Sequence, residues 1–232
     1  LADTFVRFLL AAAPFPLYIR GLPFTICSIS RGSTMNSSTI AARYTPRMKT
    51  LALAALSLAF PASASPPTAR EVMAAVSQDY VRTTVDKLPT FGTRHSLSDA
   101  TSPTRGIGAA RNWIKSEFES FRGKLQVSFE EFEPPVTGRV SKPTTFVNVV
   151  AVLPGTLTPD RHYYVVGHYD SMPSDVMDPN TDAPGANDDG SGTTAVMAIA
   201  RAMADKPCES TIVFLCTAGE EQSLLGAKYR AD

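Results

Sequence analysis

Apolar and polar positions along residues 146–232 predict strands and helices in alternation. Apolar runs over residues 146–153, 161–166 and 211–217 are rich in β-branched and aromatic side chains, which is typical of buried strands. Small and apolar residues from Ser191 to Ala204 predict a helix packed on a sheet, and a further helix is expected from Glu220 onward. This order predicts an α/β protein, a three-layer α/β/α sandwich around a mixed, mostly parallel sheet.

The preceding segment predicts two helices and a strand. From Ala69 to Pro89, apolar residues recur at helical spacing, which predicts one amphipathic helix that the proline stops. A second helix is expected from about Gly106 to Gly123, because its apolar positions step by three or four residues. Residues 125–132 begin with alternating apolar and polar side chains and predict a strand.

The first 64 residues differ from the rest in charge. Residues 1–64 carry six Lys or Arg and one Asp, whereas residues 65–232 carry 16 Lys or Arg and 21 Asp or Glu. Met48 and Lys49 precede an apolar run over residues 51–60 and a small-residue ending at Ala64, the order of a secretory signal peptide. A short buried helix is the alternative, and the run is too short to span a bilayer, which needs roughly 20 residues.

We therefore expect residues 1–47 to be an upstream leader outside the mature protein, residues 48–64 to be a signal peptide and residues 65–232 to be the folded part. The expected localisation is secreted or periplasmic, with no stable membrane span after signal cleavage. The acidic folded part gives no reason to expect a nucleic-acid partner. Because the chain begins at Leu1 and ends within an expected helix, we also expect it to be a fragment. The sequence does not indicate an oligomeric state.

Few cysteines remain after the predicted cleavage. Cys216 lies in an apolar strand run, where a buried free thiol is expected, and Cys208 lies in a turn. An oxidising compartment would allow disulfides. No CxxC pattern predicts a cysteine metal site.

A first candidate motif, Gly167-His168-Tyr169-Asp170-Ser171, follows the strand over residues 161–166. Residues two apart on an extended chain project to the same side. His168 could bind a metal while Asp170 fixes its tautomer, or both could bind the metal. A surface histidine beside a loop aspartate is the alternative.

Two further motifs carry paired acids. Asp188-Asp189 lies among glycines just before the helix that starts at Ser191, and Glu220-Glu221 follows the last strand. Adjacent carboxylates repel each other, which indicates a cation or several N–H donors nearby. Helix capping by Asp189 or Ser191 is one alternative, and first-turn carboxylates that favour the helix dipole are another. A phosphate loop is disfavoured, because two acids would repel phosphate and no Walker lysine is present.

Taken together, the three motifs predict a metal site. Histidine, aspartate and glutamate are the ligand types of hydrolytic zinc, and carboxylates can bridge two ions. A separate glutamate supplies a base. Open α/β sheets place their active sites at the ends of strands, which is where two of these motifs lie.

The stretches GHYDS, APGANDDGSG and AGEEQSLLGA resemble the co-catalytic zinc exopeptidases, the family of secreted bacterial leucyl aminopeptidases and glutamate carboxypeptidase. The similarity runs from roughly Val72 to Tyr229 and includes the stretch FGTRH at residues 91–95. It implies that residues 65–232 are the N-terminal portion of a zinc peptidase domain.

The resemblance also implies roles for individual residues. His168 and Glu221 would each bind one of two zinc ions, and Asp188 would bridge both, with a cis peptide bond to Asp189. Asp170 would orient His168, and Glu220 would be the general base. The implied enzyme is a zinc aminopeptidase that cleaves the N-terminal bond of peptide substrates.

The family supplies two more zinc ligands, an Asp and a His, downstream of the Glu pair, where this chain has already ended. We therefore expect the fragment alone to bind metal weakly and to be inactive. A non-catalytic binding relative is one alternative, and a glutaminyl cyclase is another. A carboxypeptidase is disfavoured because residues 69–145 leave no room for an inserted domain.

Overall fold

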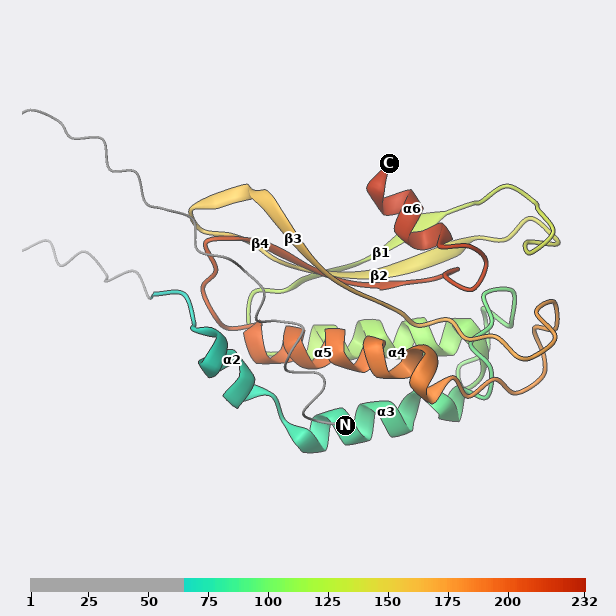
Figure 1. The fold of residues 1–232 in the computed structure, drawn as a ribbon, viewed down its shortest axis with the longest axis horizontal. Helices are drawn as coiled ribbons and strands as arrows, with labels where there is room; N and C mark the ends of the chain where they lie inside the picture. Colours follow the sequence, from blue (N-terminus) through green and yellow to red (C-terminus); the bar gives the residue numbers. More distant parts are fainter. Residues whose placement is uncertain (1–64) are drawn as a thin grey trace, which may run out of the picture. The chain divides into compact units, whose positions relative to one another are not determined.

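The computed structural model describes residues 65–232, so the predicted leader and signal peptide lie outside the described residues. The elements are drawn in Figure 1. In chain order they are α2 (Ala69–Ala75), α3 (Gln78–Lys87), the 3₁₀ turn η2 (Leu88–Phe91), α4 (Gly106–Ser120), β1 (Gln126–Phe132), β2 (Phe146–Leu153), β3 (Thr158–His168), the π-type turn η3 (Ala186–Gly190), α5 (Ser191–Met203), β4 (Ser210–Thr217) and α6 (Leu225–Ala231).

The sheet has four strands in the order β1-β2-β4-β3. β3 and β4 are parallel, whereas β2 runs antiparallel to both β1 and β4. The α/β class and the mixed sheet are confirmed. The expectation of a mostly parallel sheet is not met within residues 65–232, because β1 and β2 are joined by a local reversal rather than by a crossover helix.

Helices cover both faces of the sheet. In Figure 1, α3, α4 and α5 lie on one face and the short α6 lies on the other, which gives the three predicted layers. The main core forms between the sheet and the first helix layer. Its fully buried side chains include Ile114 and Phe118 of α4, Met197 of α5 and Phe214 of β4. The two inner strands, β2 and β4, are buried along most of their length, because helices cover both faces of the sheet.

The predicted helix over residues 69–88 is two helices. Thr68 and Glu71 form a capping box at the start of α2, and Ser77 accepts a hydrogen bond from the Tyr80 amide at the start of α3. Val76, between them, is extended. The apolar spacing alone did not show the break, because a second cap interrupts the helix without interrupting the apolar pattern.

The last helix begins at Leu225 and not at Glu220. Residues 220–224 form turns, and Gly226 packs so closely against Ala218 that an added Cβ would lie 2.4 Å from the Ala218 oxygen. Asn148 ties this connection to β2, since its side chain accepts from the Ala218 amide and donates to the Gly226 carbonyl. The two glutamates therefore lie in a connection held by hydrogen bonds, outside any helix.

Cys208 and Cys216 are buried free thiols, as predicted for Cys216. Burial raises the pKa of the Cys216 thiol, so it stays protonated and unreactive. Among residues 65–232, none of the helices is long and apolar enough to cross a membrane.

Candidate active site

The first and third motifs meet because β3 and β4 are parallel neighbours. His168, the last residue of β3, pairs with Thr217, the last residue of β4, and the Tyr169 amide donates to the Thr217 carbonyl at 3.0 Å. The carboxyl ends of both strands thus open at the same edge of the sheet. This is the place where open α/β sheets bind ligands.

Four carboxylates surround the His168 ring. Its Nε2 lies 3.2 Å from an Asp188 oxygen, 3.7 Å from a Glu220 oxygen and 4.0 Å from an Asp189 oxygen. Its Nδ1 lies 3.4 Å from an oxygen of Asp170. One imidazole nitrogen therefore faces several anionic oxygens, while the other faces Asp170 alone.

Asp170 is fully buried and accepts hydrogen bonds from both glutamates of the third motif. One of its oxygens accepts from the Glu220 amide at 3.3 Å, and the other accepts from the Glu221 amide at 3.2 Å. The same carboxylate therefore holds the backbone of the Glu pair and faces His168. Its predicted orienting role is consistent with this geometry and stays a prediction.

The two aspartates of the second motif do different work. Asp189 accepts from the Gly192 amide at 2.7 Å and from the His168 amide at 3.1 Å, so it caps α5 and joins that helix to β3. The capping alternative thus applies to Asp189. The Asp188 side chain is 77% exposed and faces His168 across the site. The peptide bond between them is cis, as the resemblance implied.

Glu220 and Glu221 complete the cluster. Ligand atoms of His168, Glu220 and Glu221 all lie within 4.8 Å of one another. Gly219 precedes them with φ at 73°, and an added Cβ would lie 2.7 Å from the Phe146 ring, so only glycine allows this turn. Arg139 donates to the Glu221 carbonyl at 2.7 Å from the loop between β1 and β2.

The crowding of charge shifts two pKa values. Burial alone would lower the pKa of His168, but the hydrogen bond and charge of Asp170, together with Asp189 and Glu220, raise it to about 9. Burial, reinforced by the charges of Asp170 and Asp188, raises the pKa of Glu221. The neighbouring carboxylates thus favour the protonated form of His168, and burial together with nearby carboxylates favours the protonated form of Glu221.

The sequence motifs did not include the segment with Arg94 and Ser96, which makes hydrogen bonds to this edge of the sheet. The buried Arg94 donates to the carbonyls of Leu88, Tyr169, Pro184 and Gly185. Burial lowers its pKa to about 10, with Asp170 and Asp189 opposing the shift, so it stays charged. Ser96 contacts Asp170 and the Gly219 amide. The only sequence signal for this segment was the stretch at residues 91–95 that contributed to the resemblance.

The donor set fits a zinc ion. An imidazole nitrogen and carboxylate oxygens are zinc ligands, and His168, Asp188, Glu220 and Glu221 present them toward one another. Within residues 65–232, no Lys or Arg side chain forms an ion pair with these carboxylates, so a divalent cation would relieve their repulsion.

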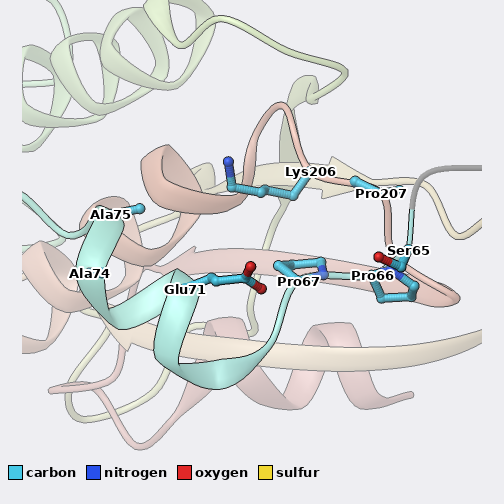
Figure 2. Close-up of a pocket in the computed structure, with 8 residues that line it drawn as sticks. All are labelled: Ser65, Pro66, Pro67, Glu71, Ala74, Ala75, Lys206 and Pro207. Carbon is cyan, nitrogen blue, oxygen red and sulfur yellow. The ribbon is translucent and has the colours of Figure 1, made fainter.

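A pocket elsewhere on the chain lacks this chemistry. Figure 2 shows it between residues 65–67, α2 and the turn at Lys206 and Pro207. That turn precedes β4, so the pocket lies near the opposite end of the strand from the Glu pair. Its one carboxylate, Glu71, is engaged with Thr68 in the capping box. We therefore assign the site to the sheet edge.

Comparisons with known proteins agree with this assignment. Residues 148–232 match the sequence model of peptidase family M28. A probable zinc metalloprotease of Pyricularia oryzae is 49% identical over 155 residues, which cover 65% of this chain and 31% of that protein. One of Phaeosphaeria nodorum is 36% identical over 227 residues, 88% of this chain and 46% of that protein. The chain thus spans less than half the length of these curated relatives.

The fold also has a solved counterpart. An aminopeptidase from Aneurinibacillus sp. strain AM-1 superposes with a TM-score of 0.52 at 12% identity, over 70% of this chain and 67% of that one. This likeness concerns the fold alone. The sequence match contains His168, both aspartates of the second motif and the Glu pair. The match of residues 148–232 to peptidase family M28 confirms the resemblance to the co-catalytic zinc exopeptidases.

Proposed function

We propose that this chain is part of a zinc-dependent aminopeptidase that hydrolyses the N-terminal bond of peptides. The observation that carries the proposal is the single imidazole of His168 among the carboxylates of Asp188 and Glu220, at 3.2 and 3.7 Å, with Glu221 beside them. The match to family M28 and the zinc metalloprotease relatives support a metallopeptidase. Cleavage at the first residue, and a site of two ions, are the finer parts of the proposal.

The residues divide into holders and a base. His168, Asp188 and Glu221 would hold zinc, and Asp188 would bridge two ions. Zinc held there would supply a Lewis acid for the scissile carbonyl and would lower the pKa of the attacking water. The Asp170 carboxylate lies 3.4 Å from Nδ1 of His168 and would accept its proton, which would leave the Nε2 lone pair directed at the site.

Glu220 would move the proton. Its side chain is 35% exposed, and one of its oxygens lies 3.7 Å from Nε2 of His168. It would take a proton from the attacking water and return it to the nitrogen of the leaving amine, so that the peptide bond breaks as a carboxylate and an amine form. Asp170 holds the Glu220 amide and thereby its backbone position.

The test uses the full-length protein with amino-acid p-nitroanilides and with the same compounds acetylated at the amine. We expect zinc-dependent hydrolysis of the free amines and little hydrolysis of the blocked ones. Equal hydrolysis of both would contradict an aminopeptidase. Conversion of N-terminal glutamine to pyroglutamate in a glutaminyl peptide, without hydrolysis, would indicate a glutaminyl cyclase instead. Metal analysis of the active protein measures the number of ions.

We also infer export, on the pattern of residues 48–64 alone. N-terminal sequencing of the secreted protein is expected to begin at Ser65. A mature protein that retains residues 48–64 would contradict this.

A further inference from the structure

We infer that Ser96 is a positioning residue for the metal site, because its hydroxyl locks together the two strand ends that carry the ligands. The inference rests on the proposed function. Ser96 lies in the segment between η2 and α4, far in sequence from all three motifs. It is 4% exposed, so water does not replace its hydrogen bonds.

The Ser96 hydroxyl makes one hydrogen bond in each direction. It donates to an oxygen of Asp170 at 3.2 Å and accepts from the Gly219 amide at 3.1 Å. Asp170 follows β3, and Gly219 follows β4. One oxygen atom therefore connects the segment that carries His168 to the segment that carries Glu220 and Glu221.

The link matters for the metal site because Asp170 contacts both the Glu pair and His168. Its two oxygens accept from the amides of Glu220 and Glu221, and one of them faces Nδ1 of His168. The oxygen that accepts from Ser96 is also the one that accepts from the Glu221 amide. Loss of the hydroxyl would leave the buried Gly219 amide without its acceptor and allow the Asp170 carboxylate to rotate. Rotation would misplace His168 relative to the glutamates.

The rest of the segment holds Ser96 in place. Arg94 and Ser171 exchange hydrogen bonds, from the Arg94 amide to the Ser171 hydroxyl at 3.1 Å and from the Ser171 amide to the Arg94 carbonyl at 3.3 Å. The Arg94 side chain also donates to the Tyr169 carbonyl at 2.7 Å. Ser96 is thus anchored beside the end of β3, and its position does not depend on Asp170 alone.

Thr211 offers a matched control. Thr211 is 5% exposed, and its hydroxyl also bridges a donor and an acceptor, accepting from the Gly155 amide at 3.0 Å and donating to the Pro159 carbonyl at 2.7 Å. It lies near the start of β4, at the opposite end of the strand from the glutamates. Thr211→Val likewise removes two hydrogen bonds of a buried side chain, although these are only partly buried, without touching the site.

The experiment measures Zn²⁺ affinity by competition with a chromophoric chelator in the full-length protein, for wild type, Ser96→Ala, Ser96→Thr and Thr211→Val. Outer hydrogen-bond partners of metal ligands typically change affinity by about 10- to 100-fold, so we expect at least about a tenfold loss for Ser96→Ala. Ser96→Thr keeps the hydroxyl and is expected to stay within about threefold of wild type. Thr211→Val is expected to lower the melting temperature and leave Zn²⁺ affinity unchanged.

Wild-type affinity in a folded Ser96→Ala would overturn the inference, as would an equal loss in Thr211→Val, which would mark a purely structural effect. Should Ser96→Ala not fold, Ser96→Cys decides: its thiol is a weak donor, so an intermediate loss is expected, and wild-type affinity would contradict the inference. A wild-type protein that binds no Zn²⁺ would instead contradict the proposed function. The two failures are thereby distinguished.

Discussion

The two ends of β4 satisfy their polar groups in different ways. At the start, the Thr211 hydroxyl joins an amide and a carbonyl, and every partner is neutral. At the end, the Ser96 hydroxyl has the same geometry, but its acceptor is the Asp170 carboxylate, which also serves two glutamate amides. At the start of β4, the polar groups are satisfied by neutral hydrogen-bond partners, whereas the end of β4 lies beside several carboxylates and a single histidine.

The difference shows that one end of a strand can add stability while the other end holds charged groups that can bind a ligand. The neutral end adds stability and needs no ligand. At the charged end, burial and repulsion from neighbouring carboxylates raise the pKa of Glu221. We expect such a cluster of carboxylates to lower the stability of the metal-free protein, and we expect cation binding to restore that stability. The following predictions test that contrast.

The largest effect is expected from Glu220→Gln. Glutamine keeps the size of the side chain but cannot accept a proton, so kcat is expected to fall by about 10²- to 10⁴-fold. Zn²⁺ binding is expected to persist, since Glu220 is assigned as the base. Steady-state kinetics and a Zn²⁺ titration measure the two effects separately.

Glu209→Gln provides the control at the other end of β4, where Glu209 is exposed. We expect it to change neither kcat nor Zn²⁺ affinity. If Glu220→Gln abolished Zn²⁺ binding and lowered kcat only through that loss, the assignment of Glu220 as base rather than ligand would be wrong.

Removal of the metal is expected to give the second largest effect. At a free Zn²⁺ concentration a thousand times the Kd, binding stabilises the folded state by about 4 kcal/mol. A chelator is therefore expected to lower the Tm by at least about 5 °C in a thermal melt. His168→Ala should show a much smaller chelator effect, and an equal drop in that variant would place the metal elsewhere.

The metal-free protein is expected to lose stability as pH rises. The pKa of His168 is raised from 6.5 to about 9, so its contribution is complete below pH 6.5 and is lost as pH rises through about 9. The raised pKa of Glu221 acts in the same direction above about pH 4.5. Thermal melts in chelator are expected to give a higher Tm at pH 6 than at pH 9.5. This difference in Tm is expected to be smaller in His168→Gln, because the variant lacks the imidazole contribution.

Zinc should reverse this trend, because it competes with the proton for Nε2 of His168. Zn²⁺ affinity is therefore expected to rise from pH 6 to pH 8. An affinity independent of pH over this range would argue against His168 as a ligand.

The smallest effect is expected from Arg139→Ala. Arg139 is exposed and makes one hydrogen bond, to the Glu221 carbonyl, which water can replace. We expect a change of about 0.5–1 kcal/mol in unfolding free energy by urea titration and about a threefold change in kcat/KM. A loss of a hundredfold or more would show that Arg139 contacts the substrate directly.

Most of the fold could be predicted from the pattern of residues. The strands near residues 126–132, 146–153 and 210–217 and the helices at residues 106–120 and 191–203 lie close to their expected positions. The misses share a cause. Ser77 interrupts a helix by capping, and the turn before Leu225 is held by Asn148, so hydrogen bonds and not periodicity set both boundaries.

The sequence by itself determined the chemistry of this protein: a histidine, an aspartate pair and a glutamate pair at the ends of predicted strands and the start of a helix. The motifs alone left capping by Asp189 as an alternative, and only the family resemblance gave the members of each pair separate roles. Only the folded chain shows that Asp189 caps α5 while Asp188 faces His168, because the Asp189 carboxylate also accepts from the His168 amide and holds this segment at the end of β3.

The hydrogen bonds of Ser96 that support the site could be found only from the three-dimensional structure. Ser96 bonds to Asp170, 74 residues away, and to Gly219, 123 residues away. Such contacts leave no period and no local motif, since they depend on the path of the whole chain. Local patterns record which residues could react, whereas long-range hydrogen bonds between strand ends decide how those residues are held.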